Sequence, residues 1–242
     1  MRLDAFLAQT LQITRKEAKQ TLKNAGVFVN GERIKKAQHP VDPHHDTIVC
    51  EGKTLHFEAN ADYVYHKPKG LVVAHRDALH PTIFEQLPLS VNTRDLRALG
   101  RLDKDTTGLM ILSTDGTFNH QLMHGKKTLG KTYDVTLDRP FESLESLTQP
   151  MTLRDGKGES YQVKTPMVHD VKDTHVRLTI YEGKTHQVKH MFAALGYEVI
   201  ALHRHAIGSL SLPESLKVGD VMPLDKDIKM KLLEEAKEEG LP

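Results

Sequence analysis

The chain has 242 residues, of which 38% are hydrophobic and 27% are charged, and its formal net charge is +1. This length and composition are typical of a globular protein with one large domain or two to three small ones, and no run of 18 apolar residues is present to span a membrane. Cys50 is the only cysteine, which excludes an internal disulfide and any multi-cysteine metal site. The N-terminus has no apolar run of signal-peptide length. We therefore expect a cytoplasmic protein.

The charge is unevenly distributed along the chain. The first 36 residues hold eight Lys or Arg against three acids, a net charge of +5. Within them, Thr14 and Glu17 have the spacing of a capping box, which predicts the start of a helix, and Gly26 is placed to end that helix in a left-handed conformation. Three apolar residues share one face of this helix: Ala18, Leu22 and Ala25.

Basic residues follow a different face of the same predicted helix. They form a stripe that consists of Arg15, Lys16, Lys19 and Lys23. A stripe of this kind suits a nucleic-acid phosphate backbone, although it is equally consistent with an ordinary solvated surface.

The next segment, "VFVNGERI", predicts a tight hairpin with Asn30-Gly31 at its turn, and the strand-like "TIVCEG" follows. Together with the basic helix, this segment resembles the S4-type RNA-binding domain, a small α+β module. We therefore expect an S4-like domain over residues 1–58 and a linker over 59–62.

The remainder of the chain predicts more strands than helices. Strands are expected in "YVYHKPKGLVVA", at Leu109–Thr114, and in "KTYDVTLDRP", "HVRLTIYEG" and "YEVIALHR". Helices are expected after Asp115, which with Thr114 is a candidate cap, and in "THQVKHMFAALG". Because strands and helices do not strictly alternate, we expect an α+β fold with a largely antiparallel mixed sheet and flanking helices over residues 63–232, followed by a polar C-terminal helix or tail over 233–242.

The stretch "GRLDKDTTGLMILSTDG" from Gly100 to Gly116 is the most informative segment for function. One interpretation is the D-x-D-x-T loop of haloacid-dehalogenase-type phosphatases. That chemistry needs an aspartate at the carboxyl end of a buried strand, whereas here the apolar strand comes after the acids. A second interpretation is a structural turn with a satisfied ion pair. A third makes Asp103 a lone nucleophile and Asp105 a structural residue.

The third interpretation is favoured by a family resemblance. The stretch resembles the signature of the pseudouridine synthases of the RsuA/RluB/RluE/RluF group. "KPKG" at 67–70, "KTYDVTL" at 131–137 and "IYEGKTHQVKHMFAALGYEVIALHR" at 180–204 resemble further motifs of that family in the same order. The resemblance covers nearly the whole chain, and the last motif is most similar to the branch that modifies the small ribosomal subunit.

The resemblance implies isomerisation of a uridine in ribosomal RNA, most simply one uridine of 16S rRNA, present as naked RNA or in a partly assembled ribonucleoprotein. Breaking a C–N glycosidic bond and forming a C–C bond neither adds nor removes atoms. In keeping with this, the chain shows no Gly-x-Gly-x-x-Gly loop and no Cys/His metal spacing, so we expect no cofactor and no metal. His203 and His205 lack a local third ligand. We expect a monomer with no membrane association.

The resemblance also implies roles for individual residues. Asp103 is the nucleophile, Tyr133 stacks on the flipped base, and Lys189 is the ion-pair partner of the aspartate, with Lys184 as an alternative partner. Arg101 reaches the RNA where the base departs. The expected substrate-binding residues are Val188, Lys67, Lys69 and the basic stripe. From the strand pattern alone, Tyr133 is more typical of a core position, and for Val188, on the apolar face of its helix, a core role is nearly as consistent as a contact with the base.

Two other functions remain open at this level. The chain could be a 23S rRNA-directed enzyme of the same family, or a non-catalytic RNA-binding or ribosome-assembly factor that keeps the fold. The combined presence of Asp103, Tyr133 and Lys189 favours an enzyme, because a binding protein has no need of all three.

Overall fold

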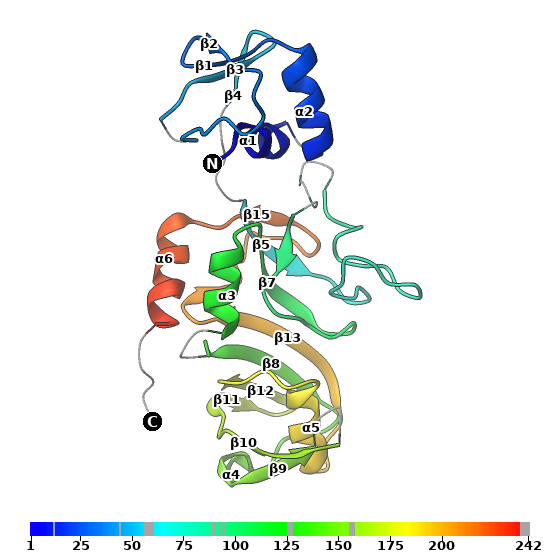
Figure 1. Cartoon of the computed structure of the whole chain (residues 1–242). Helices are drawn as coiled ribbons and strands as arrows, with labels where there is room; N and C mark the ends of the chain where they lie inside the picture. The colour runs from blue at the N-terminus through cyan, green and yellow to red at the C-terminus, as the bar shows by residue number, and fades with distance from the viewer. Residues whose placement is uncertain are drawn as a thin grey trace. The chain divides into compact units, whose positions relative to one another are not determined.

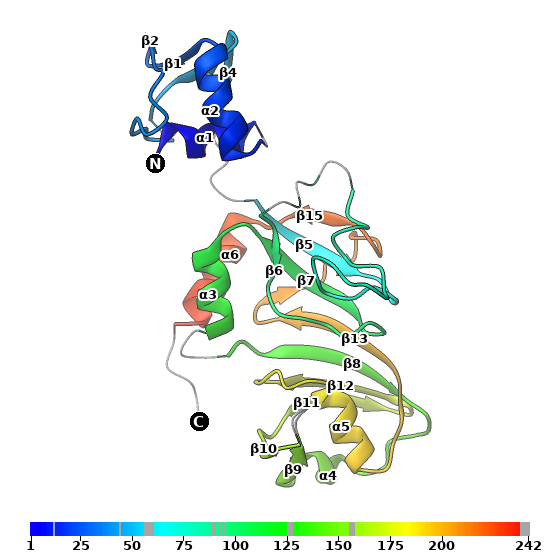
Figure 2. The ribbon, with the colours of Figure 1, turned by 45° about the vertical axis from the view of Figure 1, so that its right-hand side comes forward.

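The computed structural model describes residues 1–11, 13–43, 45–55, 61–88, 91, 93, 95–124, 128–154 and 158–237. The chain divides into two compact units, Met1–Ala61 and Asp62–Pro242. The ribbon views in Figures 1 and 2 show the helices and strands of each unit. No helix among these residues combines the length and apolar character needed to span a membrane.

The first unit packs two helices on a four-stranded antiparallel sheet of order β2-β1-β3-β4. Its elements are α1 (Leu3–Thr10), α2 (Arg15–Asn24), β1 (Val27–Val29), β2 (Glu32–Arg33), β3 (Ile48–Cys50) and β4 (Lys53–Leu55). The predicted hairpin turn is confirmed, because Asn30 and Gly31 both have positive φ, at 51° and 84°.

The predicted capping box at the start of α2 is also confirmed. The Thr14 hydroxyl accepts a hydrogen bond from the Glu17 amide at 3.0 Å, and the Thr14 amide donates to the Glu17 carboxylate at 2.6 Å. The prediction for the other end of the helix was wrong: Gly26 is not among the residues with positive φ, since Ala25 already turns the chain into an extended conformation.

The second unit is built on a nine-stranded sheet whose main order is β11-β12-β8-β13-β7-β5-β15, with β14 on β13 and β6 on β7. Its strands are β5 (Asp62–Lys67), β6 (Arg97–Ala98), β7 (Thr107–Ser113), β8 (Lys131–Leu137), β11 (Met167–Lys172), β12 (His175–Ile180), β13 (Val199–Ile207), β14 (Leu210–Ser211) and β15 (Val221–Pro223). Among the described residues, only the pairing of β13 with β7 in this sheet is parallel. The expected largely antiparallel mixed sheet is therefore confirmed.

Four helices and a separate two-stranded ribbon complete this unit. They are α3 (Gly116–His124), α4 (Leu144–Thr148), α5 (Gln187–Ala194), α6 (Lys226–Glu235), β9 (Met151–Arg154) and β10 (Ser160–Val163). In both ribbon views α3 and α6 lie side by side, whereas α5 lies near β9 and β10. As expected, the Asp115 carboxylate caps α3 by accepting hydrogen bonds from the amides of Thr117 and Phe118.

Strand β7 is buried on both faces, which explains the uninterrupted apolar run that follows Asp103. Met110 and Leu112 belong to one core cluster, and Leu109 and Ile111 to another. Because side chains alternate along a strand, the two clusters lie on opposite faces of the sheet. Helix α5 contributes to the first cluster, and α3 and α6 contribute to the second.

The expected domain boundaries need two changes. Strand β5 already begins at Asp62, inside the expected linker, of which residues 59 and 60 lie outside the described part of the chain. A boundary after residue 232 would divide α6, whose Leu232 is fully buried in the second core cluster. Helix α6 is therefore part of the larger unit, because its apolar face packs on the sheet.

A glycine allows β7 and β13 to approach each other. Gly108 has φ 111°, and a Cβ placed there would lie 2.3 Å from the backbone oxygen of Arg204. A side chain at this position would combine backbone strain with a clash against another backbone. Gly108 therefore fixes the close pairing of the two strands at the point where β7 leaves the Asp103 turn.

We expect Gly108→Ala to lower the free energy of unfolding by at least about 2 kcal/mol, as measured by urea denaturation. Gly116→Ala is the matched control. It lies in α3 with no atom near its added Cβ, and it should change stability by less than about 1 kcal/mol, if anything upward. Equal stability of the two variants would contradict the proposed role of Gly108.

Candidate active site

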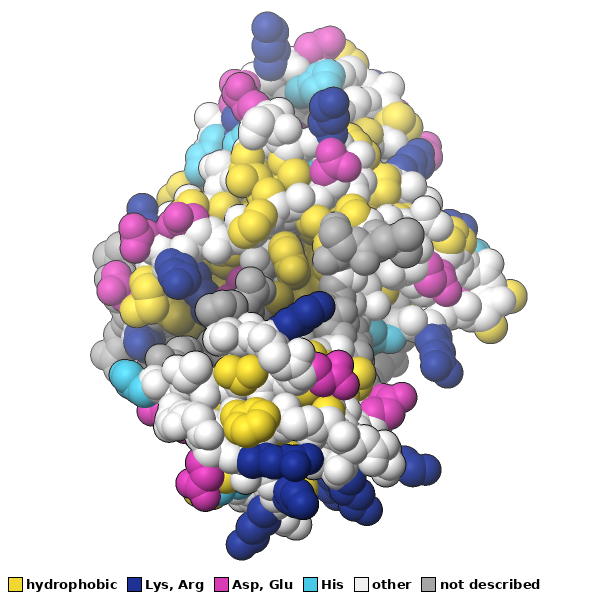
Figure 3. Space-filling view, turned by 90° about the horizontal axis from the view of Figure 1, so that it is seen from above, with side chains coloured by type: hydrophobic (Ala, Val, Ile, Leu, Met, Phe, Trp, Pro, Cys, Tyr) yellow, Lys and Arg dark blue, Asp and Glu magenta, His cyan; other side chains and the backbone are white. Residues whose placement is uncertain are grey.

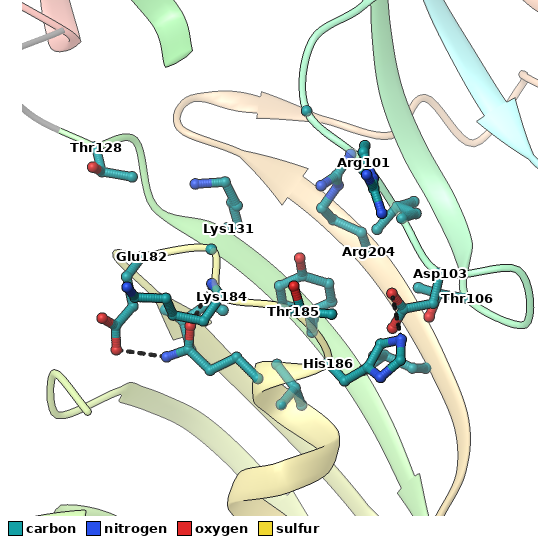
Figure 4. Close-up of a pocket in the computed structure, with 18 of the residues that line it drawn as sticks. Arg101, Asp103, Thr106, Thr128, Lys131, Glu182, Lys184, Thr185, His186 and Arg204 are labelled. Carbon is teal, nitrogen blue, oxygen red and sulfur yellow. Dashed lines mark hydrogen bonds and ion pairs between the residues drawn. The ribbon is translucent and has the colours of Figure 1, made fainter. Parts of the chain in front are cut away.

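A cavity of about 750 Å³ opens in the larger unit, on the side of the sheet where the Asp103 turn, β8 and the segment before α5 meet. Such a volume is typical of small-molecule and cofactor pockets. Figure 4 shows Asp103 and His186 at one side of it and Lys131, Glu182 and Lys184 toward the other. Segments far apart in the sequence thus build one site.

A buried lysine holds the backbone of the turn that carries Asp103. The Lys67 side chain is fully buried, and its ammonium group lies 2.8–3.3 Å from four backbone carbonyl oxygens, to which it donates: those of Pro68, Asp103, Lys104 and Thr106. The Gly70 amide donates to the Lys104 carbonyl at 2.7 Å. These contacts fix the backbone of the turn.

Lys67 was predicted to bind substrate, and this prediction was wrong. Its position in "KPKG" suggested a basic surface turn, but Lys67 is the last residue of β5 and points into the protein, whereas Lys69 is exposed. Burial lowers the pKa of Lys67 to about 8, against the opposing charges of Asp105 and Asp103. Its role in the structure is to hold the turn.

The Asp103 carboxylate is 28% exposed and faces two potential cations. His186 Nε2 lies 3.4 Å from its Oδ1, and Lys189 Nζ lies 3.9 Å from its Oδ2. Lys189 is bound more closely by Asp105, at 2.6 and 2.7 Å. The expected pairing of Lys189 with Asp103 is therefore present only as the longer of two contacts.

Asp105 was expected to be merely structural, and the structure gives it a more specific position. Burial alone would raise the pKa of Asp105, but the hydrogen bonds and the charge of Lys189 outweigh burial, and the pKa lies below its usual value. Lys189 lies in the first turn of α5, where the helix dipole disfavours a cation. The carboxylates of Asp103 and Asp105, which face Lys189, offset this unfavourable interaction with the helix dipole.

His186 was not identified from the sequence. It occupies the N-cap position of α5 in a left-handed conformation with φ 53°, which is uncommon for a residue other than glycine. This backbone conformation turns its ring toward Asp103 (Figure 4). The only sequence signal was its place inside "GKTHQVK", directly before the predicted helix.

Tyr133 and Val188 are core residues that also line the cavity. Each is more than nine-tenths buried in the first core cluster, and each also lines the cavity. The exposed Arg101 lines the same cavity. Lys184, the alternative partner of Asp103, instead holds its ammonium 5.3 Å from the centre of the Tyr161 ring.

His203 and His205, the two histidines near the end of the last family motif, each have another partner. His203 Nδ1 lies 2.9 Å from the Thr107 hydroxyl, and His205 Nδ1 lies 3.8 Å from the Asp134 carboxylate. Within the described part of the chain, no group of three or more His, Cys, Asp or Glu side chains is arranged to hold a metal ion.

The four residues of the basic stripe, Arg15, Lys16, Lys19 and Lys23, lie on α2 and are all exposed. Ala18 and Leu22, on the other face of the helix, are buried. In Figure 3, several Lys and Arg side chains lie close together along the lower edge of the view, whereas the other Lys and Arg side chains and the acidic ones are dispersed over that face.

Comparisons with known proteins agree with this division of the chain. A family model described as RNA pseudouridylate synthase matches residues 62–194, and a model of the S4 domain matches residues 1–48. The chain is similar to ribosomal small subunit pseudouridine synthase A of Pasteurella multocida (strain Pm70), at 39% identity over 94% of this chain and 97% of the relative. The Escherichia coli (strain K12) protein of the same name is 36% identical over the same shares of both chains.

A solved structure gives the same result. A crystal structure of a pseudouridylate synthase is 37% identical to this chain, covers 96% of it and 99% of its own chain, and superimposes with a TM-score of 0.66.

We expect Lys67→Met to lower the free energy of unfolding at pH 7 by at least about 2 kcal/mol, because it removes the ammonium group that donates to four backbone carbonyl oxygens. Urea denaturation measures this. Lys69→Met, at the exposed position two residues on, should change stability by less than about 0.5 kcal/mol.

The pH dependence of stability gives an additional readout for the same variant. The folded-state pKa of Lys67, about 8, lies below the ordinary lysine value of 10.5, so between these pH values the unfolded chain binds more protons. Stability should rise with pH across this window, and the rise should be smaller in Lys67→Met than in Lys69→Met. An identical pH dependence in both variants would show that Lys67 is not buried as described.

Proposed function

Because the chain belongs to the RNA pseudouridylate synthase family, we propose that it converts a uridine of small-subunit ribosomal RNA, the 16S rRNA, into pseudouridine. The family resemblance expected from the sequence, including the S4 domain, is confirmed. The substrate is inferred from the relatives named above, which match along almost the whole chain.

The strongest support for the catalytic role comes from Asp103. Its carboxylate is partly exposed at the side of a cavity whose volume accommodates a flipped nucleotide, and its backbone is fixed by Lys67. A carboxylate held in this way can attack C1′ of the ribose as the glycosidic bond to N1 breaks. The freed uracil anion then rotates, and its C5 attacks C1′ and displaces the Asp103 carboxylate, so that the bond between Asp103 and C1′ breaks as the new C–C bond forms. The proton on C5 leaves, and N1 gains a proton.

The surrounding residues have separate proposed roles. Tyr133 stacks on the base that has left its helix, and Val188 packs against it. Lys189, shared between Asp103 and Asp105, keeps a cation beside both carboxylates. Arg101 and Lys69 are exposed near the cavity or the turn and bind RNA.

The basic stripe on α2 supplies a second, sequence-independent contact with RNA. Its four cations project from one helix of the S4 unit and attract the phosphate backbone. The protein is proposed to act in the cytoplasm, because its one cysteine, Cys50, is free, which suits a reducing compartment. It is proposed to act as a monomer, because a single chain supplies Asp103, Tyr133 and Lys189 to one cavity region.

We expect Asp103→Asn to abolish pseudouridine formation in a 16S rRNA substrate while RNA affinity stays within about twofold of wild type. A single-turnover assay and a filter-binding titration measure the two quantities. Asp95→Asn, which removes the same charge from a residue that does not line the cavity, serves as the control. Continued pseudouridine formation by Asp103→Asn would refute the nucleophile assignment.

We expect Lys19→Ala combined with Lys23→Ala to weaken RNA binding and to reduce the slope of log affinity against log salt by about one for each lysine. Lys53→Ala, an exposed lysine on β4 of the same unit, is the control for a general charge effect. An unchanged salt slope in the double variant would rule out phosphate contacts by the stripe.

A further inference from the structure

Lys131 lines the cavity at a place that the proposed mechanism does not use. It is the first residue of β8 and is partly buried. Its ammonium donates to the Leu129 carbonyl at 3.2 Å, and none of the salt bridges among the described residues involves it. Burial, and then the charge of Arg204, lowers its pKa to about 8.

Arg204 adds a buried positive charge to the cavity, at a position between Lys131 and Asp103 (Figure 4). It is almost fully buried on β13, its Nε donates to the Leu109 carbonyl at 2.8 Å, and its buried Nη2 has no hydrogen-bond partner within the described chain. Lys131 and Arg204 therefore line the cavity with no salt bridge among the described residues; the same holds for Arg101 and Lys184, but those two are exposed to solvent. Burying Lys131 and Arg204 in this way is costly in the free protein and favours a ligand that brings acceptor oxygens or negative charge.

Strand register places Lys131 relative to the other site residues. Tyr133 lies directly opposite Arg204 on β13, and Lys131 lies opposite Ile207, toward the C-terminal end of that strand. Asp103 precedes β7, which runs parallel to β13, so it lies toward the opposite end. Tyr133 is therefore between Asp103 and Lys131 along the sheet, and Figure 4 shows Asp103 and Lys131 at opposite sides of the cavity.

The alternation of a β-strand brings Lys131 and Tyr133 to the same face. Residues two apart on a strand point to the same side and are separated by about 6.7 Å. A uracil stacked on Tyr133 with its ribose at Asp103 directs the ring atom opposite N1 away from the ribose. That atom is C4, which carries the oxygen O4.

We propose that Lys131 donates a hydrogen bond to the carbonyl oxygen at this far edge of the target base, which is O4 in uridine and O2 in pseudouridine. This inference rests on the proposed function and on the stacking role of Tyr133. It identifies Lys131 as a catalytic residue that contacts the base throughout the reaction.

The symmetry of the uracil ring explains how one donor can serve both states. To exchange N1 for C5 at the ribose, the base rotates about the axis through N3 and C6. This rotation also exchanges C2 for C4, so a carbonyl oxygen occupies the far edge before and after it. The ammonium of Lys131 therefore needs no movement to hold substrate and product in turn.

The same contact acts on rate and on specificity. When the bond to N1 breaks heterolytically, negative charge spreads from N1 to O2 and O4, and an ammonium group at the far edge stabilises it. Cytosine carries an amino group in place of O4, so its hydrogen-bond donor would face the Lys131 ammonium, which is also a donor. A site built around a lysine at this edge favours uridine over cytidine.

We expect Lys131→Met to slow single-turnover pseudouridine formation by about 100-fold, the usual effect of removing one donor to a developing anion, with RNA affinity unchanged. Lys231→Met on the exposed surface of α6 is the matched control and should react at the wild-type rate. Lys131→Gln keeps a neutral donor, so its rate should lie between those of Lys131→Met and Lys231→Met. It replaces Lys131→Met if that variant does not fold.

A substrate with 4-thiouridine at the target position tests the contact itself, because sulfur is a weaker acceptor than oxygen. The thio substitution should slow the wild type but have little further effect on Lys131→Met, so the two changes should not be additive. Additive effects would overturn the contact with O4. A variant that loses affinity and one unit of salt slope, at an unchanged rate, would indicate a phosphate contact instead and would also overturn it.

The wild-type reaction separates this inference from the proposed function. A wild-type protein that forms no pseudouridine in 16S rRNA would refute both. An active wild type with an equally active Lys131→Met would refute only the role of Lys131.

Discussion

The buried ammonium group of Lys67 holds together the part of the molecule on which the site depends. It donates to the backbone carbonyls of Asp103, Lys104 and Thr106, and to that of Pro68, at distances of 2.8–3.3 Å, and it reaches them from the end of β5. Burying a cation is costly unless its donors are satisfied, and here three carbonyls of the Asp103 turn and the Pro68 carbonyl satisfy them. The same interaction thus offsets the burial of Lys67 and fixes the backbone that presents the Asp103 carboxylate.

The electrostatics of the cavity divide it into two regions. At one side, Asp103 and Asp105 share Lys189, and His186 lies beside Asp103. Lys131 lies toward the other side, Arg204 lies between the two sides opposite Tyr133, and no carboxylate of the described chain pairs with either cation. Tyr133 lies between the regions along the sheet. A nucleotide with its sugar at the acidic side and its carbonyl edge at the basic side matches this division.

Features that depend on local sequence could be predicted, and the site as a three-dimensional arrangement could be predicted only in part. The capping box at Thr14, the hairpin turn at Asn30 and the buried strand after Asp103 follow from local patterns, and each is present in the structure. The family motifs also predicted that Asp103 and Lys189 lie near each other, and in the structure they do. The closer pairing of Lys189 with Asp105 could not be predicted, because it depends on which carboxylate the α5 side chain reaches.

The residues that were missed or misassigned share one physical cause. Lys67, His186 and Lys131 are polar residues whose roles depend on burial or on an unusual backbone conformation, and neither can be predicted from residue type alone. Lys131 had one usable signal, since it lies two residues before Tyr133 and so on the same face of a strand. For Lys67, the basic wording of "KPKG" pointed to the surface instead.

Modification of small-subunit ribosomal RNA through Asp103 is tested most directly in cells that lack the protein, by mapping every pseudouridine in their ribosomal RNA. We predict the loss of one pseudouridine from 16S rRNA, its return when the wild-type chain is supplied, and no return with Asp103→Asn. A 16S rRNA that keeps all its pseudouridines, or a loss confined to 23S rRNA, would contradict the proposed function.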